Sequence, residues 1–270
     1  MTQATPQPNP AEAYEKTIAQ NIFVPWRKDM LERAAAKPGE TVLDLACGTG
    51  IVTRKLVELL GGKGKVVGLD LNPMMLAVAR ALVPTDVTPV EFHEGSGTEM
   101  PFEDGTFDLV VCQQGLQFFP DHAAGMGEIR RVLKPGGRAV VSTWRGLDDQ
   151  PFMKAVDVVV TKHLGSAGFA LPFSLGDTAL LEQLARDAGF TQVDAQVVVK
   201  DLHIPEPDKF APAMMMGAAA VLPEFAALSP EERSALIGKM MPDLMAGIAE
   251  FIHGEELVMR SATNVLVASV

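Results

Sequence analysis

The chain has 270 residues, of which 47% are hydrophobic and 21% are charged, a composition typical of a folded protein with a sizeable core. Its net charge of −11 argues against nucleic acid and anionic membranes as partners, because both are bound through an excess of Lys and Arg. No signal-peptide pattern opens the sequence, no run of about 18 apolar residues could span a bilayer, and there are only two cysteines. We therefore expect a cytoplasmic protein without a disulfide framework and without nucleic-acid or membrane partners.

The first 37 residues predict a helical lid segment. Three prolines among residues 1–10 indicate a disordered lead-in. From residue 11 to residue 37 apolar residues recur at helical spacing, and Pro25 is expected to break this stretch into two helices.

From residue 38 onward, strand patterns alternate with helix patterns. Strands are expected at 41–46, 65–70, 90–93, 107–113, 138–143, 192–202 and 257–269, and helices at 52–60, 73–82, 123–132, 151–163 and 178–188. The alternation predicts an α/β fold with a doubly wound, mostly parallel, seven-stranded Rossmann-like sheet. This domain would comprise residues 38–204 and 255–270, with an Ala- and Met-rich helical cap, residues 205–254, inserted before the last strand.

A glycine-rich turn follows the first predicted strand, in the segment VLDLACGTG at residues 42–50. Gly48 and Gly50 permit tight backbone conformations and let a ligand approach without obstruction by a Cβ atom. An ordinary strand-to-helix turn is the alternative interpretation. A dinucleotide fingerprint requires a third glycine where this chain has Thr53, so NAD fits the pattern poorly.

An acidic residue, Asp70, ends the second predicted strand, 20 positions after Gly50. That spacing is typical of the carboxylate that accepts hydrogen bonds from ribose hydroxyls in such folds. A helix N-cap is the alternative role for Asp70, but Asn72 stands closer to the helix that Pro73 opens.

Taken in order, four sequence blocks resemble the class I S-adenosylmethionine-dependent methyltransferases, of the small-molecule type related to quinone-biosynthesis C-methyltransferases. The blocks are VLDLACGTG, VVGLDLNPMML, EGSGTEMPFEDGTFDLVVCQQGLQFFPD and RRVLKPGGRAVVSTW. The similarity is close over residues 38–145 and looser elsewhere. It implies S-adenosylmethionine as cofactor, S-adenosylhomocysteine as product and a small-molecule acceptor.

The resemblance also implies roles for individual residues. Asp44 would hold the methionine ammonium or waters of the glycine turn, Asp70 the ribose hydroxyls, and Gln113 would lie near the methionine carboxylate and sulfonium. The full set of implied cofactor-binding residues is Tyr14, Asp44, Gly48, Gly50, Asp70, Leu71, Met75, Ser96, Gly97, Thr98 and Gln113. Ser96 departs from the family pattern, which usually has Asp there, and a neutral hydroxyl accepts a weaker hydrogen bond from the adenine. Two alternatives follow: a modest affinity for the cofactor, or an adenine held mainly by backbone groups.

No catalytic residue emerges from the pattern. Methyl transfer from a sulfonium depends mainly on alignment and exclusion of water, and a proton-accepting side chain is needed only for a poorly ionised nucleophile. His93, His122 and His163 are each interpreted as structural. No carboxylate pair follows the fourth strand, so no metal is expected.

Apolar and aromatic residues flank the edge of the sheet where ligands bind. They predict a capped pocket for a small apolar or aromatic acceptor, lined by Phe23, Trp26, Gln114, Phe118, Trp144 and Met215. The alternative is that they fill the core of the cap. Three other functions stay open: another reaction of the same cofactor, a non-catalytic cofactor-binding protein, and a nicotinamide-dependent dehydrogenase. The acceptor, the methylated atom (C, N, O or S), the pathway, and the choice between monomer and homodimer are undetermined.

Overall fold

The computed structural model describes residues 10–84, 86–165, 170–219 and 222–270. Except for Pro10, the predicted disordered lead-in therefore lies outside the described residues. Within the described part of the chain the sheet strands are β1 (Thr41–Leu45), β2 (Lys65–Asp70), β3 (Val90–Glu94), β4 (Phe107–Gln113), β5 (Leu133–Trp144), β6 (Gln192–Pro205), β7 (Ile252–His253) and β8 (Glu256–Ser269).

These strands form one sheet in the order β3-β2-β1-β4-β5-β8-β6, with the short β7 paired to β8 outside this path. The pairs from β3 to β5 are parallel, whereas β8 runs antiparallel to both β5 and β6. The predicted doubly wound, mostly parallel sheet is confirmed, and β7 adds an eighth strand to the seven expected. β5 begins at Leu133, ahead of the strand expected at 138–143, and the register of β4 with β5 shifts between Phe107 and Leu109.

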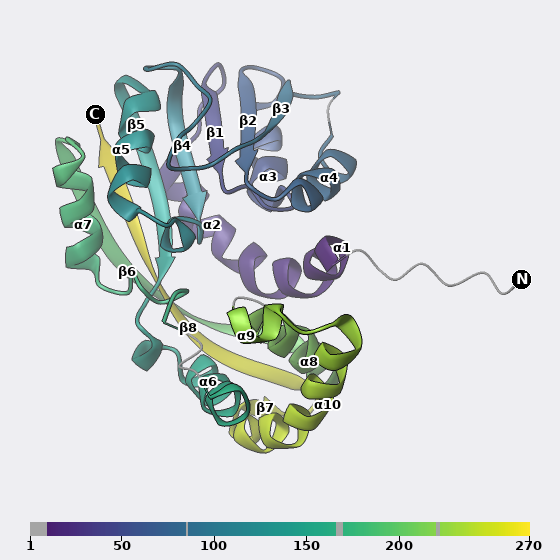
Figure 1. Ribbon diagram of the computed structural model, residues 1–270. Coiled ribbons are helices and arrows are strands. Elements are labelled where there is room, and N and C mark those ends of the chain that lie inside the picture. The colour runs from purple at the N-terminus through teal and green to yellow at the C-terminus, as the bar shows by residue number, and fades with distance from the viewer. Residues whose placement is uncertain (1–9, 85, 166–169, 220–221) are drawn as a thin grey trace, which may run out of the picture.

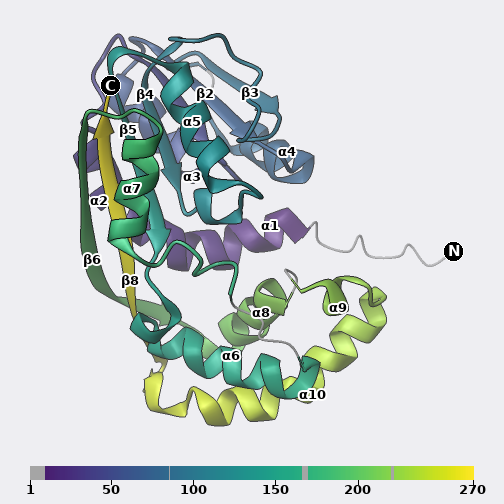
Figure 2. The ribbon, with the colours of Figure 1, turned by 60° about the vertical axis from the view of Figure 1, so that its left-hand side comes forward.

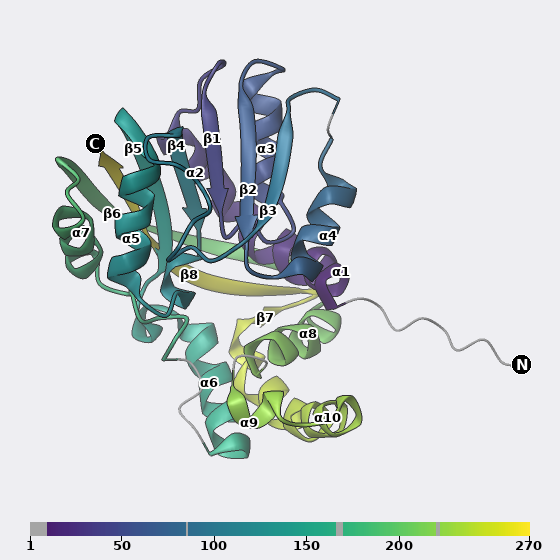
Figure 3. The same cartoon turned by 45° about the horizontal axis from the view of Figure 1, so that its top comes forward.

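Helices cover both faces of the sheet, because successive side chains on each buried strand point to opposite faces. On one face Val110 and Cys112 pack with α5 (His122–Val132) and α7 (Thr178–Asp187). On the other face Leu109 and Val111 pack with α2 (Val24–Ala34) and α3 (Ile51–Leu60). The helix α4 (Pro73–Leu82) lies beside β3, as Figures 1 and 3 show. The result is a three-layer domain whose strands β1, β2 and β4 end at one edge of the sheet.

The lid is one continuous helical segment made of α1 (Pro10–Tyr14), the π-helix η1 (Glu15–Phe23) and α2. It crosses the space between the sheet and the cap (Figure 1). The predicted division at Pro25 is found as a change of helix type without an interruption of the helical path. The π-helix ends at Phe23 and α2 begins at Val24, with Pro25 in its first turn, where proline is tolerated.

The cap is built from α6 (Pro151–Leu164), α8 (Pro207–Ala219), α9 (Pro223–Ala226) and α10 (Pro230–Gly247), with the short η4 (Ala249–Phe251). Its core also contains the far ends of β6 and β8, through Ile204 and Leu257. The two strands stay paired from Gln192–Ser269 to Pro205–Glu256, well past the end of β5 (Figure 2). The predicted insert, residues 205–254, therefore leaves out α6, which packs into its core.

Candidate functional site

A cavity of about 640 Å³ lies where the carboxyl ends of β1, β2 and β4 meet the lid and the cap. That volume falls within the range of about 300–1,000 Å³ typical of sites for small molecules. The short helices η2 (Leu116–Phe118) and η3 (Leu147–Asp149) lie in the connections that follow β4 and β5. The position follows from the topology, since ligands of doubly wound sheets bind outside the carboxyl ends of the strands.

The glycine turn after β1 forms one wall of this cavity. Ala46 and Gly48 have positive φ angles of 55° and 54°, and a Cβ atom added at Gly48 would meet nothing within 4 Å. Gly48 is on the cavity wall, but Gly50 is not. A Cβ atom at Gly50 would lie 3.1 Å from Val83 Cγ2 and 3.2 Å from Ala79 Cβ, so the close approach of α4, together with a φ of 80°, accounts for this glycine.

Asp70 lies on the cavity wall at the end of β2 and is held by backbone groups. Its Oδ2 accepts a hydrogen bond from the Gly48 N–H at 2.7 Å, and its Oδ1 accepts one from the Asn72 N–H at 2.8 Å. Burial raises the pKa of the Asp70 carboxyl above its ordinary value. Asn72 is the N-cap of α4 and accepts a hydrogen bond from the Met74 N–H, so the alternative role considered for Asp70 belongs to Asn72.

Asp44, on β1, is 1% exposed and also reaches the cavity. Its Oδ2 accepts a hydrogen bond from the Thr53 hydroxyl at 2.5 Å. Thr53 stands where a dinucleotide fingerprint has glycine, and here its side chain supports this carboxylate. Burial raises the pKa of Asp44 to about 7, against the lowering effect of the Thr53 hydrogen bonds.

The turn after β3 supplies a smaller polar group. Ser96 and Gly97 lie on the cavity wall, whereas Thr98 does not. The Thr98 side chain lies 2.8 Å from the Ser96 hydroxyl, and its backbone N–H donates to the same oxygen at 3.2 Å. Thr98 therefore orients Ser96. Leu71 and Met75 also lie on the wall, with Leu71 71% exposed at the rim.

Two glutamines, Gln113 at the end of β4 and Gln114 directly after it, lie on the cavity wall. Gln113 Nε2 donates to the backbone oxygen of Phe23 at 2.7 Å and so ties the lid to the sheet. Gln113 Oε1 and Gln114 Nε2 are buried and have no hydrogen-bond partner among the described residues. Gln114 has a positive φ of 54°, a conformation uncommon for a residue with a side chain and frequent at functional sites.

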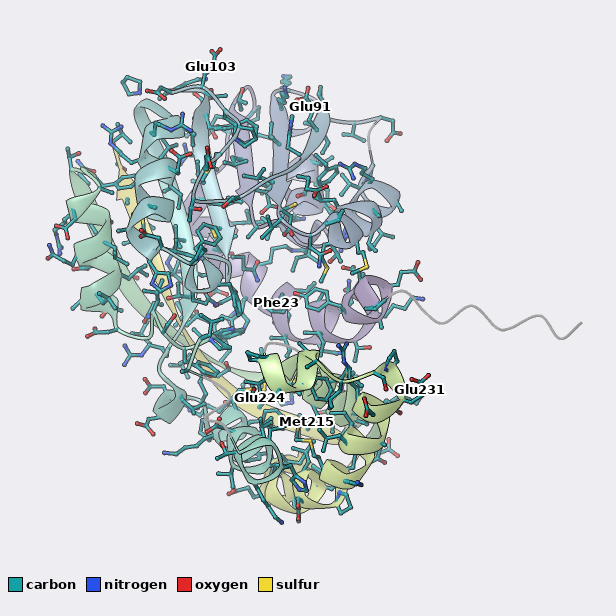
Figure 4. The ribbon with its side chains drawn as sticks, viewed as in Figure 1. Phe23, Glu91, Glu103, Met215, Glu224 and Glu231 are labelled. Carbon is teal, nitrogen blue, oxygen red and sulfur yellow. The ribbon has the colours of Figure 1, made fainter. Side chains whose placement is uncertain are left out.

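The half of the cavity facing the cap is mostly apolar, with Gln150 and Ser261 as polar residues, and three of the aromatic residues predicted for the acceptor line the cavity: Phe23, Phe118 and Trp144. Trp26 and Met215 do not line it. Trp26 is 3% exposed, packs edge-on against Trp144 and lies under Lys200 Nζ. Met215 is 0% exposed in the core of the cap (Figure 4). Both therefore act as core residues, the alternative that the sequence left open.

Several wall residues escaped sequence reasoning: Ile18, Ile22, Thr49, Gln150, Met153, Met259 and Ser261. The helical spacing of Ile18 and Ile22 was visible in the sequence and could have identified them. Met153 and Met259 could not be found, because α6 and β8 reach the cavity only through the long β6–β8 pairing.

Ionisable groups on the described wall are confined to one half of the cavity: Tyr14, Asp44, Cys47 and Asp70. Burial, together with the nearby Asp70 and Glu15 carboxylates, raises the pKa of Tyr14, and burial raises that of Cys47, so both stay protonated. The described residues contain no cluster of three or more His, Cys, Asp or Glu side chains suited to a metal ion. No helix in the described ranges is long and apolar enough to cross a membrane.

A doubly wound sheet that brings a glycine turn and an acidic strand end to one cavity is the arrangement of a nucleotide-binding domain. The profile of the ubiE/COQ5 methyltransferase family matches residues 12–171. A demethylmenaquinone methyltransferase from Lactococcus lactis subsp. lactis (strain IL1403) is 35% identical over 185 residues, 63% of this chain and 73% of the relative. A ubiquinone/menaquinone biosynthesis C-methyltransferase from Shewanella frigidimarina is 34% identical, with the same coverage of both chains.

Among solved structures, a phosphoethanolamine N-methyltransferase of Haemonchus contortus, in complex with S-adenosylhomocysteine, aligns with a TM-score of 0.58. It is 20% identical, covers 96% of this chain and 56% of its own, and supports the fold alone. The chain belongs to the ubiE/COQ5 methyltransferase family and uses S-adenosylmethionine as its methyl donor. The other functions that the sequence left open are not favoured, because the named relatives are methyltransferases.

Proposed function

We propose that the protein methylates a small apolar or aromatic molecule, with the donor in the polar half of the cavity and the acceptor beneath the cap. The observation that carries the proposal is the division of one cavity into two halves. Asp44, Gly48 and Asp70 form one half, and Phe23, Trp144 and residues of the cap form the other. Gln113 at the end of β4 and Gln114 directly after it would lie between the halves, where donor and acceptor would meet.

In the polar half, each group of the donor has a chemically suitable neighbour. Asp70 is oriented by two backbone N–H groups and would accept hydrogen bonds from the ribose hydroxyls. The Asp44 carboxylate would attract the ammonium of the donor's methionine part. The neutral Tyr14 hydroxyl would donate a hydrogen bond to the carboxylate of that same part of the donor. Gln113 Oε1 has no protein partner among the described residues and is available to the donor. Bound there, S-adenosylmethionine supplies an activated methyl group, and the chain's own task is to align it and exclude water.

The acceptor half carries no ionised side chain on its described wall, so we expect an acceptor without a charged group in its reacting portion. Its apolar residues include Phe23 of η1, Trp144 of β5, Met153 of α6, Met214 of α8 and Met259 of β8. Methionine side chains adapt to irregular apolar shapes. The cap helices α8 to α10 lie outside residues 12–171, which the family profile matches, so acceptor choice is where this chain would differ from its relatives.

A panel of quinols, phenols and amines incubated with the methyl donor tests the proposal. The relatives' names make a demethylmenaquinone-type quinol the first compound to try. We expect mass spectrometry to show addition of one methyl group to an aromatic member of the panel, and no turnover of hydrophilic, charged amines. Turnover restricted to charged amines would contradict the proposed acceptor class. The cytoplasmic location and the absence of a nucleic-acid partner stay predictions.

Donor binding is expected to depend on pH through Asp44, whose pKa burial raises to about 7. The ammonium favours the ionised carboxylate, so binding should lower this pKa and release a proton near neutral pH. Affinity for S-adenosylhomocysteine should then fall roughly tenfold between about pH 7.5 and about pH 6. Calorimetry in two buffers that differ in ionisation enthalpy measures both effects.

Asp44→Asn is the control for this pH dependence. The variant should bind more weakly, with an affinity that stays nearly constant over the same range. The raised pKa also affects stability without ligand. The folded state holds the Asp44 proton up to about pH 7. The protonated Asp44 therefore contributes to the free energy of unfolding in acid, and this contribution is lost as pH rises through about 4 to 7. A pH-independent affinity in the wild type would contradict the role of Asp44.

A further inference from the structure

The lid contains an unusual helical element. Residues Glu15–Phe23 form the π-helix η1, a type that is rare and frequently found at functional sites. In an α-helix, residues nine apart, such as Tyr14 and Phe23, are separated by about two and a half turns and face opposite sides. The wider turn of a π-helix brings these two onto one face. Their ring centroids lie 5.9 Å apart, and both side chains line the cavity.

This single face spans both halves of the cavity. Tyr14 lies at the polar end, where the Asp70 carboxylate contributes to raising its pKa. Phe23 lies at the apolar end, 6.1 Å from Trp144 between ring centroids, and Figure 4 shows it where the lid meets the sheet. Ile18 and Ile22, between them, line the cavity as well. A lid that shifts or changes its helical register would therefore alter the donor and acceptor halves together.

At its N-terminal end the lid is bound to the glycine turn through Glu15, a carboxylate that is only 7% exposed. The Thr49 hydroxyl donates to Glu15 Oε2, and Arg54 Nη2 donates to Glu15 Oε1 at 2.6 Å. Arg54 Nη1 donates in turn to the Thr49 backbone oxygen at 2.9 Å. Glu15, Thr49 and Arg54 thus connect the lid, the cavity wall and α3 in one closed set of hydrogen bonds.

At its other end the lid is bound to β4, because Gln113 Nε2 donates to the Phe23 backbone oxygen at 2.7 Å. Both attachment points, Thr49 and Gln113, are themselves on the cavity wall. The buried Glu15 carboxylate and the partly buried Arg54 guanidinium are costly to remove from water and add little net stability over apolar residues of similar size. A conformational role therefore explains Glu15 better than a stabilising one.

We propose that Glu15 is a positioning residue that latches the lid to the glycine turn, so that donor binding at the turn closes the lid and completes the acceptor half. The proposal rests on the proposed function, since it requires the donor in the polar half. The latch acts through Thr49: a ligand that holds the turn in one conformation also holds the partner groups of Glu15. Because Tyr14 and Phe23 are joined by the π-helix, a fixed position of Tyr14 also fixes the position of Phe23.

Hydrogen exchange with and without saturating S-adenosylhomocysteine tests the latch. In the wild type, the ligand is expected to slow amide exchange across η1 by about tenfold or more. In Glu15→Met, which keeps the volume and removes both acceptor oxygens, bound ligand should leave exchange across η1 at its ligand-free rate. Glu15→Gln, which keeps one acceptor, should restore part of the protection. Glu12→Met is the matched control, because Glu12 is an exposed glutamate one turn earlier, and it should behave as the wild type.

Glu15→Met leaves the Arg54 charge unpaired, which could unfold the variant. The double variant Glu15→Met/Arg54→Met removes that charge as well and should show the same loss of protection. Ligand-induced protection of η1 in that variant equal to the wild type would overturn the latch while leaving the function intact. Failure of the wild type to bind S-adenosylhomocysteine would instead contradict the proposed function itself. A purely structural role for Glu15 predicts lower thermal stability with undiminished ligand-induced protection, which would also overturn the proposal.

Discussion

Asp70→Ala is expected to weaken S-adenosylmethionine binding by about 100-fold, the equivalent of about 2.7 kcal/mol. The substitution removes the proposed acceptor for two ribose hydroxyls, and hydrogen bonds to charged groups contribute about 1.5–3 kcal/mol each. It also leaves the Gly48 and Asn72 N–H groups without their partner, which loosens the glycine turn. Isothermal titration of S-adenosylmethionine, S-adenosylhomocysteine and NAD into the wild type and the variant measures the effect.

Two further variants separate charge from shape. Asp70→Asn retains an acceptor oxygen and should lose less affinity than Asp70→Ala. Asp208→Ala changes an exposed aspartate at the start of α8 and should leave binding unchanged. NAD should produce no heat with any of these proteins. Equal affinity of the wild type and Asp70→Ala for the sulfur compounds would contradict the ribose role of Asp70.

Met215→Ala is expected to lower the free energy of unfolding by about 2–5 kcal/mol, because it opens a void in a packed core. Met215 is 0% exposed and packs among the buried residues of the cap. The next residue, Met216, is 37% exposed and supplies the matched control. Met216→Ala should change the unfolding free energy by less than about 0.5 kcal/mol. Urea unfolding of the two variants compares them directly.

Cofactor affinity distinguishes the core role of Met215 from a role in the acceptor pocket. Because Met215 is remote from the polar half, binding of S-adenosylhomocysteine to the folded variant should match the wild type. Unchanged stability combined with altered acceptor turnover would contradict the core role and return Met215 to the pocket.

The local features of the donor site were predictable because each depends on a short stretch of sequence. Gly48 follows a buried strand directly, and Asp70 ends the next strand, so the topology of the sheet brings both to one cavity. The assignment of the N-cap to Asn72 instead of Asp70 was also predictable, since an N-cap is defined by its distance from the helix start. The parallel strands were predictable because strands buried on both faces have continuous apolar sequences.

Other assignments failed because their cause lies far away along the chain. Gly50 matches the glycine pattern, but its neighbours are Ala79 of α4 and Val83, the C-cap residue of that helix. Trp26 and Met215 are apolar and lie on helices near the cavity, yet helical spacing does not distinguish a side chain facing a core from one facing a ligand. Only the packed structure decides which of the two it is.

From the sequence alone come the doubly wound sheet and the glycine turn with its acidic partner, because local propensity and strand order depend on contiguous residues. The methyl-donor chemistry came from the resemblance of four sequence blocks to a methyltransferase family. The tertiary structure alone decided the shape of the acceptor half. The long pairing of β6 with β8 carries Met259 to the cavity wall, and the π-helix turns Tyr14 and Phe23 onto one face. Both features depend on contacts between segments that are distant in the sequence. A short sequence pattern does not reveal the energies of such contacts.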